Sequence, residues 1–213
     1  MRIILFQTMD KKEHIIDIAL ELFAQKGFEG TSIRDIAERG EVNVAMVNYY
    51  FGTKEKLFEA IVEHKASYMK GILENLELDK TKTEIEKMDA IIEVYVNRLL
   101  SQSSFHRVLH QELLMQQRES MHENIVGVFV KNTQRIKNII EQGIRKKQFR
   151  KVDPELTMAS LIGTINQVLL SKALCNMLMQ RDENFNPYTD EKFRKRIIAH
   201  LKQMIHAHLL IDK

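Results

Sequence analysis

The stretch VNVAMVNYYFGTKEKLFEAIVEH, residues 42–64, places two of the chain's five tyrosines side by side in a very short apolar segment. Neighbouring residues of a helix project about 100° apart, so at most one of Tyr49 and Tyr50 can face a core fully. Asn43 is suited to cap the start of a helix of about seven residues. The Gly-Thr-Lys sequence that follows Phe51 ends this helix. The adjacent tyrosines therefore need an explanation other than core packing.

A helical wheel separates the short helix into an inner and an outer side. Val44 and Phe51 lie within about 60° of Val47, whereas Ala45 and Tyr49 lie on the opposite side. We expect Val47 and Phe51 to anchor the helix against a core. Both tyrosines then remain outside, where a nucleic acid can be contacted.

The flanking segments complete a compact helical pattern. Apolar residues spaced at the helical period predict a first helix over residues 11–26 and a second over 32–39, which Thr31 can cap. A long fourth helix begins after Thr53. Three helices joined by two tight turns, with the shortest one facing outward, are the layout of a helix-turn-helix, here over about residues 32–51. In such a motif the second helix of the pair enters the DNA major groove.

With these residues in view, the chain resembles the TetR family of bacterial transcriptional regulators over about residues 9–69. The resemblance is carried by "KGFEGTSIRDIA", "YYF" and "TKEKL", in the family's order and spacing. It implies an all-helical homodimer with an N-terminal DNA-binding domain, a variable ligand-binding domain, and action as a repressor released by a small molecule. The positions that match the family's DNA contacts are Thr31, Ser32, Asn43, Val44, Ala45, Met46, Asn48, Tyr49, Tyr50 and Lys54.

The expected contacts divide into two physical kinds. Amides at the helix starts, Lys54 and Tyr50 are suited to phosphate oxygens. Met46 and Tyr49 can touch a thymine methyl group, and Asn48 can pair with adenine if it points inward. The sequence also departs from the family twice. Glu41 stands where glycine is usual and can alter the turn, and Asn48 stands where tyrosine is common, so a tyrosine contact to phosphate is lost there.

Composition sets the broad class of protein. The chain has 213 residues, 44% of them hydrophobic, which is enough to bury a core. It has only 8 glycines and 2 prolines, so we expect long helices. The single cysteine, Cys175, excludes an internal disulfide and suits a reducing cytosol, so a cytoplasmic protein is expected. No apolar run approaches the roughly 18 residues that span a bilayer, so we expect no membrane partner.

The charge distribution supports an alternative function. Residues 1–65 hold nine Lys/Arg and eleven Asp/Glu, a net charge of −2. Because the whole chain has a net charge of +3, the rest of the chain carries +5. A DNA surface in the N-terminal part must therefore arrange its cations locally. The acidic balance favours the alternative of a helical small-molecule binding or sensor protein with a vestigial DNA-binding domain. An enzyme using a central cavity is a third possibility, although no GxGxxG, P-loop, HExxH or GxSxG motif is present.

The last two thirds of the chain show helical periodicity without a specific motif. Helices are expected over 83–101, 104–119, 122–146, 154–180 and 189–210. The helix over 154–180 is apolar nearly all round, so one face can pack in its own domain and the other against a partner chain. With the last helix it is expected to form a two-fold, four-helix dimer interface. The expected interface residues are Leu161, Ile165, Val168, Leu169, Phe193, Ile197, Leu201 and Ile205.

The middle helices mix apolar and polar side chains, which is typical of a ligand pocket. The candidate lining residues, for each of which plain core packing or surface exposure is the stronger alternative, are Tyr95, Phe105, His106, His110, Met115, Phe129 and Asn166. The two histidines have a spacing that can hold a metal, but no third ligand is evident, so neither a metal nor a cofactor is expected.

The complete expectation has three parts. Residues 1–8 form a flexible N-terminal extension, residues 9–69 a helix-turn-helix DNA-binding domain, and residues 70–213 a helical ligand-binding and dimerisation domain. The partners expected are a palindromic double-stranded operator, an unidentified small-molecule effector and a second copy of the chain.

Overall fold

The computed structural model describes residues 2–115 and 118–211, with side chains from residue 11 onward except at residue 169. The regular secondary structure of this part of the chain is helical apart from an isolated bridge between Phe149 and Leu210, so the predicted all-α fold is confirmed. The helices are α1 (Arg2–Lys26), α2 (Ile33–Arg39), α3 (Val44–Phe51), α4 (Lys54–Leu78), α5 (Glu84–Ser101), α6 (Ser103–Met115), α7 (Glu119–Arg145), α8 (Pro154–Leu169), α9 (Lys172–Leu178) and α10 (Glu191–Leu209).

The chain divides into two compact units. The N-terminal unit comprises Met1–Tyr68 with Ser104–Phe129, and the C-terminal unit comprises Met69–Ser103 with Val130–Lys213. Helix α6 and the first part of α7 thus pack with the N-terminal helices, although they lie beyond residue 70 in sequence. The division into domains at residue 69 stays a prediction. The flexible extension over residues 1–8 stays a prediction as well: the backbone of residues 2–8 belongs to α1, and the side chains before residue 11 lie outside the described part.

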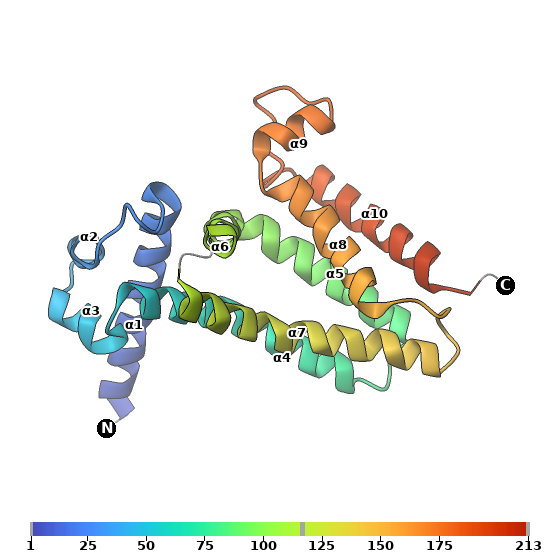
Figure 1. Cartoon of the computed structure of the whole chain (residues 1–213), viewed down its shortest axis with the longest axis horizontal. Coiled ribbons are helices and arrows are strands. Elements are labelled where there is room, and N and C mark those ends of the chain that lie inside the picture. The colour runs from blue at the N-terminus through green and yellow to red at the C-terminus, as the bar shows by residue number, and fades with distance from the viewer. Residues whose placement is uncertain (1, 116–117, 212–213) are drawn as a thin grey trace. The chain divides into compact units, whose positions relative to one another are not determined.

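The N-terminal unit is built around an aromatic cluster. The rings of Phe23 and Phe28 stack at 5.2 Å, and Phe58 of α4 meets both edge-on at 5.7 and 5.5 Å. All three side chains are buried. Helix α2 packs against α1 and α3, and Figure 1 shows α2 and α3 joined by a short turn beside α1. The cluster therefore joins α1, the loop before α2 and α4, the segments that flank the predicted helix-turn-helix.

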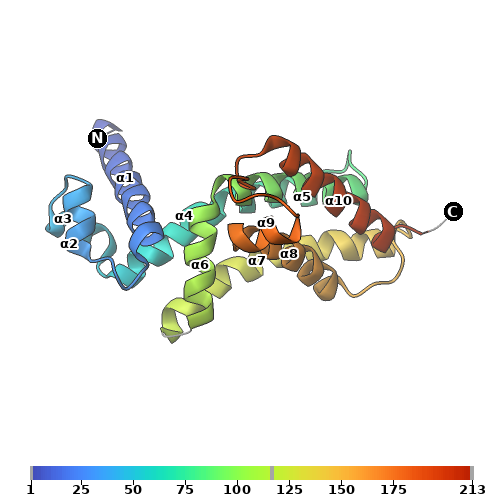
Figure 2. The same cartoon turned by 90° about the horizontal axis from the view of Figure 1, so that it is seen from above.

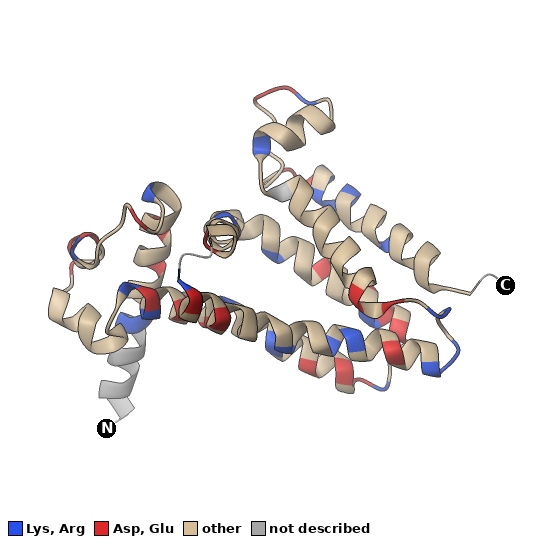
Figure 3. Cartoon of the chain, viewed as in Figure 1, with Lys and Arg blue, Asp and Glu red and all other residues tan. Residues whose placement is uncertain are grey.

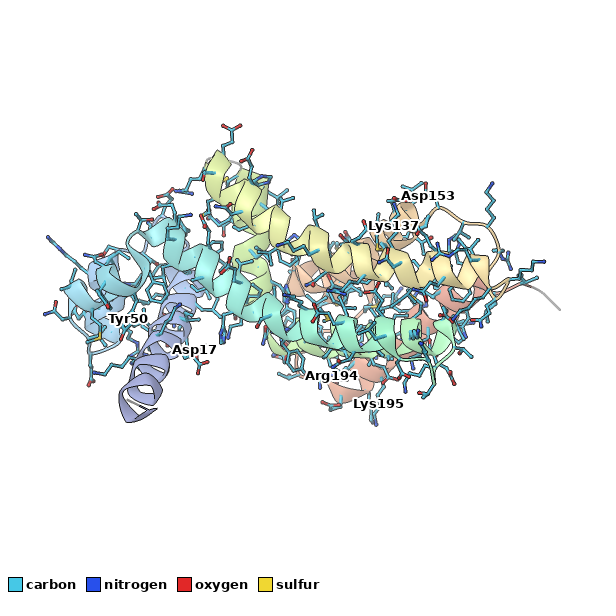
Figure 4. All side chains as sticks on the ribbon, turned by 90° about the horizontal axis from the view of Figure 1, so that it is seen from below. Asp17, Tyr50, Lys137, Asp153, Arg194 and Lys195 are labelled. Carbon is cyan, nitrogen blue, oxygen red and sulfur yellow. The ribbon has the colours of Figure 1, made fainter. Side chains whose placement is uncertain are left out.

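The C-terminal unit has a separate core. Helix α10 packs along α5, and α8 packs on α5 as well, an arrangement that can be followed in Figure 2. Polar contacts reinforce the packing: the His206 ring of α10 lies 2.8 Å from the Asp89 carboxylate of α5, and Arg135 of α7 donates to Glu74 and Glu77 of α4 at 2.6 and 2.8 Å. In Figure 4, Lys137 of α7 lies close to Asp153, which caps α8.

One expected helix is broken. Residues 154–180 form α8 and α9, which meet at an angle of 98°. The Ser171 side chain accepts a hydrogen bond from the Leu174 backbone N–H at 3.2 Å, so it caps a new helix in a stretch whose apolar pattern runs on without interruption. In the described part of the chain, no single helix is long and apolar enough to cross a membrane; only the bent pair α8–α9 meets that test, by length and composition.

The residues expected at a dimer interface are buried within one chain. Leu161, Ile165, Val168, Phe193, Ile197, Leu201 and Ile205 are each at most 8% exposed, and the side chain of Leu169 lies outside the described part. The helical period identified the inward faces of α8 and α10, but those faces are covered by the protomer's own core. An interface on these helices would therefore use their other faces, where Leu156 is 66% exposed and Lys195, Ala199 and Gln203 are exposed.

Acid is expected to destabilise the C-terminal unit through Asp79. The hydroxyl and backbone N–H of Thr81 donate to this carboxylate at 2.6 and 2.8 Å and hold its pKa at about 2, below the usual 3.8. Because the folded-state pKa is depressed, the contribution to stability is complete above the unfolded-state pKa and is lost as pH falls towards 2.

Asp79→Asn should therefore make the urea unfolding midpoint less dependent on pH between about 5 and 2. Thr81→Val, which removes the larger cause of the shift, should have a similar but smaller effect. Equal pH slopes in all three proteins would contradict this assignment.

Candidate nucleic-acid interface

The start of α2 is fixed by Ser32 rather than by the expected cap, Thr31. The Ser32 side chain accepts from the Asp35 backbone N–H at 3.1 Å, and the Asp35 carboxylate accepts from the Ser32 backbone N–H at 2.8 Å, which completes a capping box. Thr31 is instead buried, and its hydroxyl donates to the Gly27 carbonyl at 2.9 Å. Thr31 thus stabilises the loop before α2 from inside, while Ser32 lies exposed at the helix start.

The turn between α2 and α3 contains the unusual Glu41. Its φ of 51° lies in the left-handed region that glycine favours. The turn is held by the Val42 backbone N–H, which donates to the Ala37 carbonyl at 2.9 Å, and by the His14 ring, whose Nε2 lies 3.0 Å from the Gly40 carbonyl. The chain therefore keeps a glycine-type turn with a glutamate in it.

Replacing Glu41 with glycine is expected to stabilise the N-terminal unit by about 0.5–1 kcal/mol, because relief of the left-handed strain exceeds the added entropy of the unfolded chain. Urea unfolding measures the change. Glu41→Gln is the matched control, since it removes the charge and keeps the strain. Equal stability of the two variants would mean that the charge, not the backbone, determines the effect.

Helix α3 lies with one side in the core and the other outside, as the wheel predicts. Asn43 caps it by accepting from the Ala45 backbone N–H at 2.8 Å. Val47 is 0% and Phe51 8% exposed, whereas Tyr49 is 85% exposed. The helix carries no charged residue, as Figure 3 shows. The outer face is therefore uncharged and aromatic, suited to the grooves of a duplex rather than to its phosphates alone.

The candidate residues of α3 do not share one face. Those exposed are Asn43, Val44, Ala45, Asn48 and Tyr49; Val44 is 36% exposed despite its position near Val47 on the wheel. Met46 and Tyr50 are half-buried and pack against the core of the N-terminal unit, where Figure 4 labels Tyr50. The Tyr50 ring lies 5.5 Å from that of Tyr49 and 6.2 Å from that of Phe51. Tyr50 thus supports its neighbour while keeping an exposed part.

Lys54 has structural contacts besides its expected role. Its ammonium donates to the carbonyls of Phe28 and Thr31 at 2.8 and 2.9 Å, and lies 4.4 Å from the centroid of the Phe28 ring. Two of the three ammonium donors are thus used within the protein. Lys54 therefore holds the loop before α2 as well as carrying a charge near it.

Two cations of this unit were not identified from the sequence. Arg34 is exposed in the first turn of α2, and Lys12 of α1 is exposed with its ammonium 5.7 Å from the Phe51 ring. The net charge of residues 1–65 is negative, so it did not indicate these two cations. Part of that negative charge is paired within the unit, as in Asp17–Lys65 at 3.2 Å.

The candidate ligand residues belong to different units. Tyr95 and Asn166 lie in the C-terminal unit, where burial raises the pKa of Tyr95 to about 12. The others lie in the N-terminal unit: Phe105 is buried, Met115 is 54% exposed, and His106, His110 and Phe129 are half-buried. Within the described residues, no three His, Cys, Asp or Glu side chains form a group that could hold a metal ion. A ligand pocket lined by these residues stays a prediction.

Comparison with known proteins supports the interpretation of both halves. A model described as bacterial regulatory proteins of the tetR family matches residues 15–61, and one described as a tetracyclin repressor-like C-terminal domain matches residues 81–170. YttP of Bacillus subtilis is 37% identical over 98 residues, 46% of each chain. The HTH-type transcriptional repressor NicS of Pseudomonas putida is 30% identical over 147 residues, 65% of this chain and 66% of NicS. The matched stretches thus span about half to two thirds of these relatives' lengths.

Solved structures show the same fold over most of the chain. PfmR, a TetR family regulator from Thermus thermophilus, has a TM-score of 0.71 at 17% identity, over 93% of this chain and 99% of that chain. FadR from Bacillus subtilis, solved in complex with stearoyl-CoA, has a TM-score of 0.69 at 20% identity, over 91% of this chain and 99% of that chain.

Proposed function

Because the chain belongs to the TetR family of bacterial transcriptional regulators, we propose that it is a sequence-specific DNA-binding regulator that represses transcription. It acts in the cytoplasm as a homodimer, binds a palindromic operator, and releases it when a small-molecule effector binds. The repressors among its relatives, such as NicS, support the direction of regulation.

The exposed, uncharged face of α3 is the observation that carries the proposal. A tyrosine that is 85% exposed is unusual on a helix of eight residues whose opposite side buries Val47 and Phe51. A helix presented in this way, after a short turn from α2, has the geometry of a recognition helix. Tyr49, Asn48 and Ala45 then face base edges in the major groove.

Phosphate contacts are assigned to the ends of the neighbouring helices. Ser32 and Asn43 stand exposed at the starts of α2 and α3, where first-turn amides other than those bound by the capping side chains can donate to phosphate oxygens. Arg34 and the ammonium of Lys54 add positive charge, and the exposed part of Tyr50 adds a hydroxyl. These contacts place the protein on the duplex, and the outer face of α3 selects the sequence.

Dimerisation and release are assigned to the remaining helices. The outer face of α8 carries Leu156, Ala159 and Gly163 beside polar residues, which allows close approach of a second copy. Two recognition helices then address half-sites about one helical turn, 34–36 Å, apart. Helices α4 and α7 each continue from one unit into the other, so an effector that favours one arrangement of the C-terminal unit can change that spacing, with a coupling of about 1–3 kcal/mol.

The proposal is tested by selecting bound sequences from a pool of random duplexes at two salt concentrations, with the oligomeric state measured by light scattering. A palindrome recovered with a dimeric protein is the expected result. A monomer would contradict the assigned interface. Weak, unpatterned binding that disappears at modest salt would contradict sequence-specific regulation and favour the sensor with a vestigial DNA-binding domain.

A further inference from the structure

Arg118, the residue that precedes α7, has an unusual set of contacts within the N-terminal unit. Its guanidinium lies 4.4 Å from the centroid of the Phe28 ring. It pairs with Glu29 in the loop before α2, with Glu112 of α6 at 3.0 Å, and with Glu55 in the first turn of α4 at 3.8 Å. One side chain thus connects three segments that are distant in sequence, and two of them border the predicted phosphate-binding surface.

The loop that Arg118 contacts is the segment that sets the start of α2. Part of the loop's backbone is held by Lys54, whose ammonium donates hydrogen bonds to the carbonyls of Phe28 and Thr31. The Phe28 ring has both cations at 4.4 Å from its centroid. Ser32, the cap of α2, follows this loop directly. The position of the start of α2, including its exposed Arg34, therefore depends on what holds Phe28.

The cations and carboxylates around the Phe28 ring stabilise one another. Two cations beside one ring repel, and the carboxylates of Glu29, Glu55 and Glu112 offset that repulsion. Glu112 is 9% exposed, and burial raises its pKa against the opposing effect of Lys54. A buried carboxylate of this kind needs a hydrogen-bonded cation, and Arg118 provides one.

We propose that Arg118 is a positioning residue for the DNA-contacting surface: by binding Phe28, Glu29 and Glu55, it holds the loop before α2 in place. The orientation of that loop sets where the exposed Arg34 of α2 lies. Arg118 acts through the loop and does not itself touch DNA. The inference rests on the proposed function for its consequence in DNA binding, but its structural part can be measured without DNA.

The first measurement is amide hydrogen exchange in the full-length protein without DNA. Arg118→Gln should accelerate exchange over residues 28–35, because the loop loses its guanidinium contacts. Arg145→Gln is the matched control: it removes the same charge from an exposed arginine of the C-terminal unit. Arg118→Lys keeps the charge without the planar fork and should restore only part of the protection. Unchanged exchange over residues 28–35 in Arg118→Gln would overturn the proposal, whether or not the protein binds an operator.

The second measurement is binding of the wild-type protein and these variants to a duplex recovered by the selection, over a range of salt concentrations. Arg118→Gln should weaken binding by about 5- to 50-fold while the slope of log K against log salt stays unchanged. A slope reduced by about one would identify Arg118 as a direct phosphate contact, contrary to the proposal. Faster exchange with unchanged affinity would also overturn it, because the loop would then have no effect on binding. Failure of the wild type to select any duplex would refute the proposed function, and the exchange result would still decide the structural role.

Discussion

Replacing Phe58 with alanine is expected to lower the free energy of unfolding of the N-terminal unit by about 3–5 kcal/mol. The side chain is 0% exposed, so its removal leaves a cavity between α1 and α4. It also removes the edge-on contacts with Phe23 and Phe28, each of which contributes about 0.5–1.5 kcal/mol beyond burial. A loss of this size is a large part of a domain's total stability, typically about 5–15 kcal/mol.

The same substitution should also impair DNA binding. Phe28, which packs on Phe58, is the ring beside which Lys54 lies, and Lys54 holds the loop before α2. Urea unfolding at constant protein concentration measures the stability. Phe58→Leu is the matched control, because it keeps most of the volume, and it should cost clearly less than alanine. A loss below about 1 kcal/mol for alanine would show that the aromatic cluster does not stabilise this unit.

The recognition helix was predictable because its whole signal is local. With Val47 and Phe51 inward, a period of about 3.6 residues leaves Tyr49 outside, and no tertiary information is needed. The cap of α2 was misplaced by one residue because Thr31 and Ser32 are both good capping residues. The aspartate three positions after Ser32 is the signal that separates them, since it forms the second half of the capping box.

The partner of an apolar face was not predictable. The spacing of Phe193, Leu201 and Ile205 shows that one side of α10 is buried, but it does not say whether α5 of the same chain or a second copy covers it. The structure places α5 there. The break between α8 and α9 was missed for a related reason. Apolar residues lie on both sides of Ser171, so composition gives no sign of the turn. The ion pairs of Arg118 join residues that are far apart in sequence, and no local pattern indicates them.

Replacing Tyr49 with alanine is expected to change which sequences the protein prefers, at one base pair in each half-site of the operator. The loss on the wild-type operator should be about 10-fold or more, since a base-edge contact in the major groove contributes about 1–3 kcal/mol of discrimination. Stability should change little, because the side chain is 85% exposed. Repeating the selection with the variant, beside urea unfolding of both proteins, measures the two effects separately.

Two further variants serve as comparisons for Tyr49→Ala. Tyr68→Ala removes another exposed tyrosine, 59% exposed on α4, and should leave both affinity and base preference unchanged. Arg34→Ala, in contrast, should weaken binding to all duplexes by a similar factor and reduce the salt slope by about one, as loss of a phosphate contact does. If Tyr49→Ala behaved as Arg34→Ala does, α3 would not be the element that reads sequence. The division between base contacts on α3 and phosphate contacts at the helix starts would then be wrong.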